Sequence, residues 1–116
     1  MVLALVDDLM FRSKIKSTAA QNGITVAFAG SADAALTAMR ANPPALVIFD
    51  LDNARADPLR TIAAMKSDAA LASIPSVGYV SHVHVDMISA ARAAGVDDVL
   101  ARSAFATKLP ELLAGR

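Results

Sequence analysis

Residues 1–8 read MVLALVDD, and residues 45–50 read ALVIFD. In each stretch, a continuous run of five or six apolar residues is followed directly by aspartate. Such runs are typical of strands that are buried on both faces, as in parallel α/β sheets. Because open α/β sheets carry their ligand sites at the carboxyl ends of the strands, Asp7, Asp8 and Asp50 are predicted to share one crevice. Carboxylates in such a crevice suit a divalent cation, a phosphoryl group, or both.

The composition narrows the class of protein. The chain has 116 residues, with eleven basic and eleven acidic side chains and no cysteine. This length predicts one domain over residues 1–116. No basic run is present, which argues against nucleic-acid binding, and the lack of cysteine excludes disulfides and thiolate metal sites. The apolar runs fall well short of the roughly 20 residues of a membrane-spanning helix, and the first run is interpreted as a strand rather than a signal peptide. We therefore expect a cytoplasmic protein.

Strand and helix signals alternate along the rest of the chain. Further strands are predicted at 25–28, 77–80 and 99–100. Apolar residues at helical spacing predict five helices, which carry Phe11 to Ala19, Ala32 to Met39, Leu59 to Met65, Met87 to Ala91, and a short last helix with Leu109 to Leu113. Their predicted ends are Gly23, the N-cap Ser31, the N-cap Asp57 before Pro58, and Gly95.

Five such β-α units predict a three-layer α/β/α sandwich around a five-stranded parallel sheet. In the flavodoxin-like strand order 2-1-3-4-5, the first and third strands are neighbours, and this order brings Asp7, Asp8 and Asp50 together.

In order and spacing, these residues resemble the receiver domain of two-component response regulators, the fold of the stand-alone chemotaxis response regulator. The resemblance covers essentially the whole chain and rests on Val6-Asp7-Asp8, Ile48-Phe49-Asp50, Met65-Lys66-Ser67-Asp68, Ile74-Pro75 and Ala93-Ala94-Gly95. It implies that Asp50 accepts a phosphoryl group from a histidine kinase or phosphotransfer protein. It also implies that Asp7, Asp8, Asp50 and the backbone carbonyl of Asp52 hold Mg²⁺.

A simple electrostatic argument supports weak binding of Mg²⁺ independently of the resemblance. Two carboxylates about 5 Å apart repel each other by roughly 3 kcal/mol at an effective dielectric constant near 20. A cation in the crevice relieves that repulsion, and hard oxygen ligands suit Mg²⁺.

The sequence departs from the receiver pattern where the phosphoryl group is contacted and read out. Arg102 falls where receivers carry a lysine, and the exchange is not conservative. Val80 falls at the position of the signalling threonine or serine, although a one-residue bulge would place Ser81 there. Val99 replaces the switch aromatic residue of the fifth strand. The resemblance is therefore to a receiver that keeps its acidic residues but has lost most of the readout, as in a pseudo-receiver.

The predicted function is a receiver-like signalling domain in a two-component phosphorelay, with Asp50 modified slowly or not at all. The alternative is a phosphorylation-independent module that binds a partner protein through a helix face, as a monomer or weak homodimer. A remote alternative is an aspartyl phosphatase with Asp50 as nucleophile and Asp52 as general acid. That enzyme family places its D-x-D motif on the first strand and needs a longer chain. Otherwise no enzyme is expected beyond Mg²⁺-dependent self-phosphorylation from a donor.

Several of these residues also have simpler interpretations. Asp7 or Asp8 can cap the helix that follows. Arg102 either forms a salt bridge to the acidic cluster or is an ordinary exposed residue. His82 and His84 are interpreted as a solvated loop pair rather than metal ligands. Tyr79 is expected in the core, with its hydroxyl bonded to the backbone.

Overall fold

The computed structural model describes residues 1–81 and 84–115, in which strands and helices alternate. The strands are β1 (Val2–Leu5), β2 (Val26–Phe28), β3 (Leu46–Asp50), β4 (Ser76–Val80) and β5 (Asp98–Ala101). The helices are α1 (Leu9–Gln21), α2 (Ala32–Ala41), α3 (Pro58–Ser67), α4 (Val85–Ala94) and α5 (Arg102–Leu113), and a short 3₁₀ turn, η1 (Ala54–Ala56), precedes α3. Within this part of the chain, no helix is long and apolar enough to cross a membrane.

The strands form one parallel sheet in the order β2-β1-β3-β4-β5, which confirms the predicted fold class. The central strand β3 pairs with β1 and β4, with Leu5 opposite Phe49 and Asp50 opposite Tyr79. Because β1 and β3 are neighbours and run in the same direction, the segments that follow them leave the sheet at the same edge. The segment that carries Asp7 and Asp8 therefore leaves the sheet next to Asp50, and the charge of Asp8 acts on Asp50.

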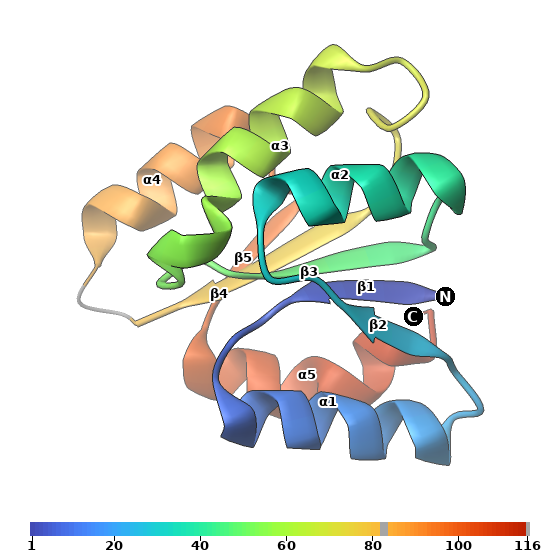
Figure 1. The fold of residues 1–116 in the computed structure, drawn as a ribbon. Coiled ribbons are helices and arrows are strands. Elements are labelled where there is room, and N and C mark those ends of the chain that lie inside the picture. Colours follow the sequence, from blue (N-terminus) through green and yellow to red (C-terminus); the bar gives the residue numbers. More distant parts are fainter. Residues whose placement is uncertain (82–83, 116) are drawn as a thin grey trace.

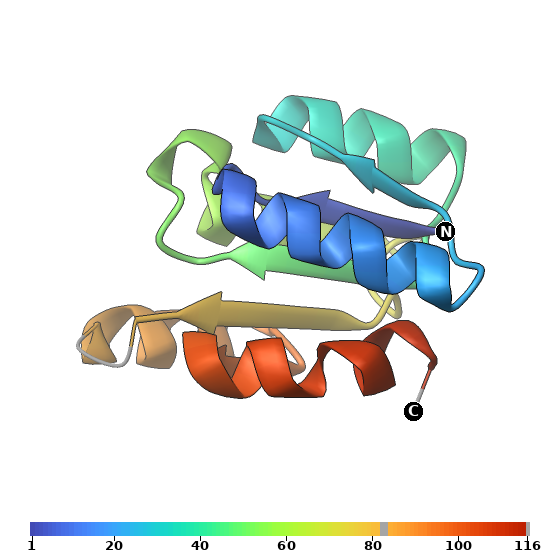
Figure 2. The same cartoon turned by 90° about the horizontal axis from the view of Figure 1, so that it is seen from below.

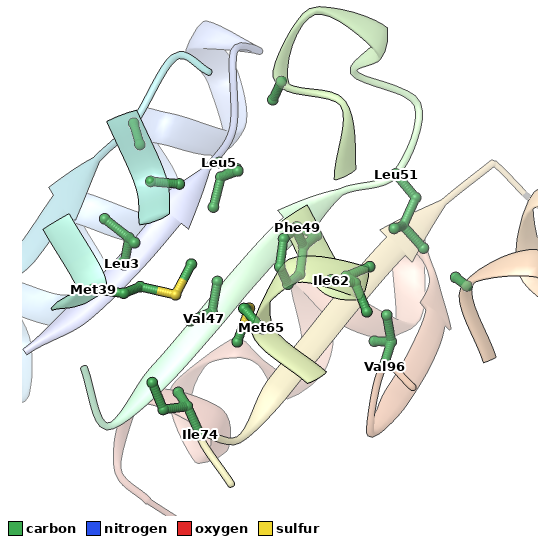
Figure 3. Close-up of a cluster of buried hydrophobic side chains, with 14 of the residues drawn as sticks. Leu3, Leu5, Met39, Val47, Phe49, Leu51, Ile62, Met65, Ile74 and Val96 are labelled. Carbon is green, nitrogen blue, oxygen red and sulfur yellow. The ribbon is translucent and has the colours of Figure 1, made fainter. Parts of the chain in front are cut away.

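The helices cover both faces of the sheet, with α2, α3 and α4 on one side and α1 and α5 on the other (Figures 1 and 2). Side chains alternate between the two faces along each strand, so each face has its own core. The core beneath α2, α3 and α4 includes Leu5 and Phe49 (Figure 3). The other core contains a stack of three rings, in which Tyr79 lies 4.7 Å from Phe11 and 4.5 Å from Phe105 between centroids. Full burial of a large apolar side chain in either core contributes about 1.5–3 kcal/mol to the stability of the fold.

Most of the predicted helix ends are found. The Ser31 hydroxyl accepts a hydrogen bond from the Ala34 N–H at 3.1 Å and so caps α2. Gly95 ends α4 with φ of 110°, a left-handed conformation that glycine adopts without the steric cost of a Cβ. Gly23 follows the last residues of α1 with φ of 67°.

Three local predictions are wrong in part. Asp57 is the N-cap residue of α3 and Pro58 is the first helical residue, as predicted, but the Asp57 side chain makes no capping hydrogen bond, because Asp57 also ends η1 and takes a left-handed backbone with φ of 45°. The last helix is not short, since α5 begins directly after β5 and is anchored early by the buried Phe105. Tyr79 lies in the core as predicted, but its hydroxyl is not bonded to the backbone in the described residues and lies close enough to the Asp50 carboxylate to interact with it.

Candidate functional site

Asp50 is the last residue of the central strand β3, and only 6% of its surface is exposed. Its Oδ1 accepts a hydrogen bond from the Asp52 backbone N–H at 3.0 Å. Burial raises the pKa of Asp50, and that N–H together with the positive charge of Arg102 offsets part of the rise. Burial and the nearby Asp50 charge also raise the pKa of Tyr79. The sheet edge therefore presents one poorly hydrated carboxylate.

Asp8 uses its two oxygens for different partners. Its Oδ1 accepts hydrogen bonds from the N–H groups of Met10 at 2.8 Å and Phe11 at 3.2 Å, so Asp8 is the N-cap of α1. Its Oδ2 accepts a hydrogen bond from Arg102 Nη2 at 3.1 Å. Both the capping role and the Arg102 salt bridge were predicted alternatives, and both are present.

Asp7 points to a different partner. Its Oδ2 accepts a hydrogen bond from Arg55 Nη1 at 3.3 Å, and 55% of the Asp7 side chain is exposed. Exposed ion pairs of this kind contribute little, with a typical value of about 0–1 kcal/mol. Asp7 therefore belongs to the rim of the crevice.

The side chain of Asp52 makes contacts in the site that the sequence did not predict. The sequence suggested a role for its backbone carbonyl, but in the structure its carboxylate accepts a hydrogen bond from the Ser81 N–H at 3.0 Å. The other oxygen contacts Nδ1 of His84. These contacts span 29 and 32 positions in the chain and join the end of β3 to the start of α4.

His84 was expected to be a solvated loop residue. Its side chain is 53% exposed, but it also contacts Asp52. His82 lies outside the described residues. The D-x-D spacing signals a second carboxylate close to Asp50, although it does not identify the partners of that carboxylate.

Arg102 is the cation at the centre of the site. It is the first residue of α5, and its guanidinium bonds to Asp8 and lies 3.9 Å from Asp52 Oδ2. The guanidinium carbon also lies 5.1 Å from the Phe11 ring centroid and 5.7 Å from that of Tyr79. Two carboxylates and two ring faces thus hold one planar cation, an arrangement that suits arginine better than lysine.

Besides Arg102, the sequence proposed Val80 or Ser81 as phosphoryl contacts and Val99 as the switch position. Val80 is fully buried in the core beneath α2, α3 and α4, and Val99 belongs to the same core with 8% exposure. At Ser81, the backbone N–H is the group that reaches the site. Of Val80 and Ser81, only Ser81 offers a donor, and its N–H already bonds to Asp52.

The predicted metal ligands are suitable in type but not in arrangement. In the described residues, no three acidic or histidine side chains are grouped so that they could hold a metal ion. Asp8 is directed to Arg102 and the start of α1, and Asp7 is directed to Arg55. The carboxylates therefore do not converge as a metal-binding set in this conformation.

An open pocket of about 370 Å³ adjoins the Asp52–His84 contact. It lies between η1, the first turn of α3 and the first turn of α4, and its lining is mostly apolar: Leu51, Asp52, Ala54, Asp57, Pro58, Leu59, His84 and Met87. The pocket leaves this side of the crevice open to a small molecule.

Solved structures define the class of the fold. A response regulator from Hahella chejuensis matches with a TM-score of 0.85 at 20% identity, over 97% of this chain and 91% of that chain. The phosphorylated cyanobacterial phytochrome response regulator RcpA matches with 0.80 at 23% identity, over 98% and 88%. The Mn²⁺-bound form of response regulator Rcp1 matches with 0.76 at 20% identity, over 98% and 88%. The fold is that of response regulator receiver domains, as the sequence resemblance predicted.

No protein-family model matches the sequence, and the search of curated proteins finds no match. The similarity to these solved structures therefore defines the fold, and the function has to be argued from the site.

Proposed function

We propose that residues 1–116 act as one receiver-like signalling domain of a cytoplasmic two-component phosphorelay, with Asp50 as a slow phosphoryl acceptor. The observation that carries this proposal is the position of Asp50, a nearly buried carboxylate at the end of the central strand with Arg102 and Asp8 beside it. The same fold occurs in RcpA, which is described in a phosphorylated form.

The chemistry is transfer of a phosphoryl group to a carboxylate oxygen of Asp50. That oxygen forms a bond to phosphorus while the bond from phosphorus to the donor's leaving group breaks, and an acyl phosphate results. Catalysis of this step depends on positioning and on donors for the transferred oxygens. Arg102 is one such donor, but Val80 supplies none, and losing one such hydrogen bond costs on the order of 3 kcal/mol, or about a hundredfold in rate.

In this proposal, a divalent cation binds the site only weakly. Rcp1 is described in a Mn²⁺-bound form. In this chain, Asp7, Asp8, Asp50 and the Asp52 carbonyl are the candidate ligands for Mg²⁺, but two of these side chains would first have to leave their arginine partners.

The partners in this proposal are proteins. Receiver domains generally interact with histidine kinases or phosphotransfer proteins, and one of these would supply the phosphoryl group. A further partner protein would bind through a helix face, to a monomer or weak homodimer. The balanced charge of the chain gives no support to a nucleic-acid partner.

The second candidate function is binding of a partner protein independently of phosphorylation. It is favoured by the Asp52 carboxylate, which already binds the Ser81 N–H and lies near Arg102. These two groups are the donors that a phosphoryl group on Asp50 would use. The same contacts argue against the phosphatase alternative, because Asp52 serves as an acceptor rather than as a general acid.

Incubation with acetyl phosphate and Mg²⁺, followed by intact-mass measurement, tests the proposal. We expect slow, incomplete addition of one phosphoryl group, absent from Asp50→Asn. Stoichiometric labelling within minutes would indicate an ordinary receiver with full catalytic capacity. Complete absence of labelling in the wild type would overturn the acceptor role and leave the phosphorylation-independent module.

A further inference from the structure

The acidic crevice already contains a cation supplied by the chain. Arg102 Nη2 bonds to Asp8 Oδ2 at 3.1 Å, and Arg102 Nη1 lies 3.9 Å from Asp52 Oδ2. The same positive charge acts on Asp50, whose pKa it lowers against the effect of burial. One guanidinium therefore neutralises charge on three aspartates that come from the ends of two strands.

The guanidinium is held in this place by more than charge. Its carbon lies over the Phe11 ring and near the Tyr79 ring, and 38% of the Arg102 side chain is exposed. The stem begins at the first residue of α5, with no loop between it and β5. Packing and backbone position thus pre-organise the cation, so little side-chain freedom is lost when it pairs.

We propose that Arg102 is the resident cation of this crevice and competes with a divalent metal ion for Asp8. The inference rests on the proposed function only in taking this sheet edge as the functional site. It explains why the carboxylates do not point toward a common metal position, although carboxylates are suitable metal ligands. Asp8 cannot turn toward a metal ion while it binds the guanidinium. Removal of the positive charge should therefore convert the crevice into a metal site.

The experiment is a titration with MnCl₂ alone, followed by calorimetry and by quenching of tyrosine fluorescence. Tyr79 is the single tyrosine of a chain without tryptophan, so the fluorescence signal comes from the site itself. The variants are Arg102→Gln, which keeps the aliphatic stem on Phe11, and Arg102→Ala. The control is Arg60→Ala, which removes the same charge from an exposed pair with Asp33.

We expect both Arg102 variants to bind Mn²⁺ roughly tenfold or more tighter than the wild type and Arg60→Ala, because a like charge has left the immediate surroundings of the ion. Adding Asp8→Asn to Arg102→Gln should abolish the gain. Equal affinity in all four proteins, or a gain that survives Asp8→Asn, would overturn the proposal. Because no phosphoryl donor is present, failure of this titration is distinguishable from failure of Asp50 to become labelled.

Discussion

At the scale of single residues, the site combines the buried carboxylate of Asp50 with the buried hydroxyl of Tyr79, which lies close enough to interact with it. Asp50 is nearly inaccessible, and Tyr79, its neighbour on β4, is completely buried. Buried polar groups lower stability unless hydrogen bonds replace their lost hydration. The burial of the Asp50 carboxylate is therefore expected to lower stability, an effect that its hydrogen bond from the Asp52 N–H offsets in part.

The first residue-scale prediction concerns Asp50→Asn and pH. Burial raises the pKa of Asp50 in the folded protein above its ordinary value of 3.8, so the folded state binds the proton more readily than the unfolded state. The contribution of Asp50 to stability is therefore favourable at low pH and is lost as pH rises through the folded pKa. Asp50→Asn should raise the Tm at pH 7, where a gain of about 1 kcal/mol corresponds to roughly 4 °C, and the gain should shrink toward pH 4.

Thermal unfolding in the presence of EDTA, from pH 4 to pH 8, measures this difference without a contribution from metal binding. Asp98→Asn is the matched control, because Asp98 is an exposed aspartate at the start of β5. A lower Tm for Asp50→Asn at pH 7 would mean that the attraction of Arg102 and the Asp52 N–H outweighs the effect of burial.

At the scale of elements, β4 packs against Leu51, the residue between Asp50 and Asp52. A Cβ built on Gly78 would come within 2.7 Å of Leu51 Cδ1 and 2.9 Å of its Cγ. Leu51 is 1% exposed and packed in the core, so it has little room to move. The close approach of β4 to Leu51 is therefore one of the contacts that fix where Asp50 and Asp52 lie.

Gly78→Ala should consequently destabilise the protein by about 1–3 kcal/mol, the usual cost of an overpacked core. Urea unfolding followed by circular dichroism measures the loss, and the denaturant slope should stay unchanged. Gly30→Ala is the control, because no atom lies within 4 Å of a Cβ at that position. Equal stability of the two variants would show that Leu51 yields without cost.

At the scale of the whole molecule, Asp52 joins the end of the central strand to the helix layer. Its contacts with Ser81 and His84 hold the start of α4 against the end of β3. Val80 and Val99 lie buried beneath that layer and offer no polar group that could follow a change at Asp50. We therefore expect α4 to hold a single position as long as Asp52 keeps these contacts.

Asp52→Ala should release this constraint. Hydrogen exchange should become about tenfold faster in the amides of α4 and stay unchanged in α1 and α5, because local opening depends on local contacts. Asp57→Asn is a suitable control, since it removes the same charge from a neighbouring position whose side chain does not cap α3. Equal exchange in α4 of both variants would mean that the Asp52 contacts contribute nothing to its order.

The sequence was sufficient for the architecture because the strands are local apolar runs and four of the five helices have a local signal at one end, whereas α5, which has none, was predicted too short. The strand order and the position of Asp50 follow from that pattern together with general rules for parallel sheets. The partners of Asp52 could not be predicted, because they depend on side-chain directions across 29 and 32 positions. Asp57 occupies the predicted N-cap position, but its side chain does not cap α3 for a similar reason, since the preceding turn η1 fixes its backbone.

The two oxygens of Asp8 couple events at the sheet edge to the outer surface of α1. One oxygen caps the helix while the other binds Arg102, and the next two residues, Leu9 and Met10, are 78% and 70% exposed. A cation that draws Asp8 away from the cap would loosen the first turn that carries these two apolar side chains. By thermodynamic reciprocity, a protein that packs on Leu9 and Met10 and tightens that turn would weaken cation binding by the same factor. The carboxylate of one residue thus links the exposed first turn of α1 to Arg102 through hydrogen bonds that do not involve Asp50.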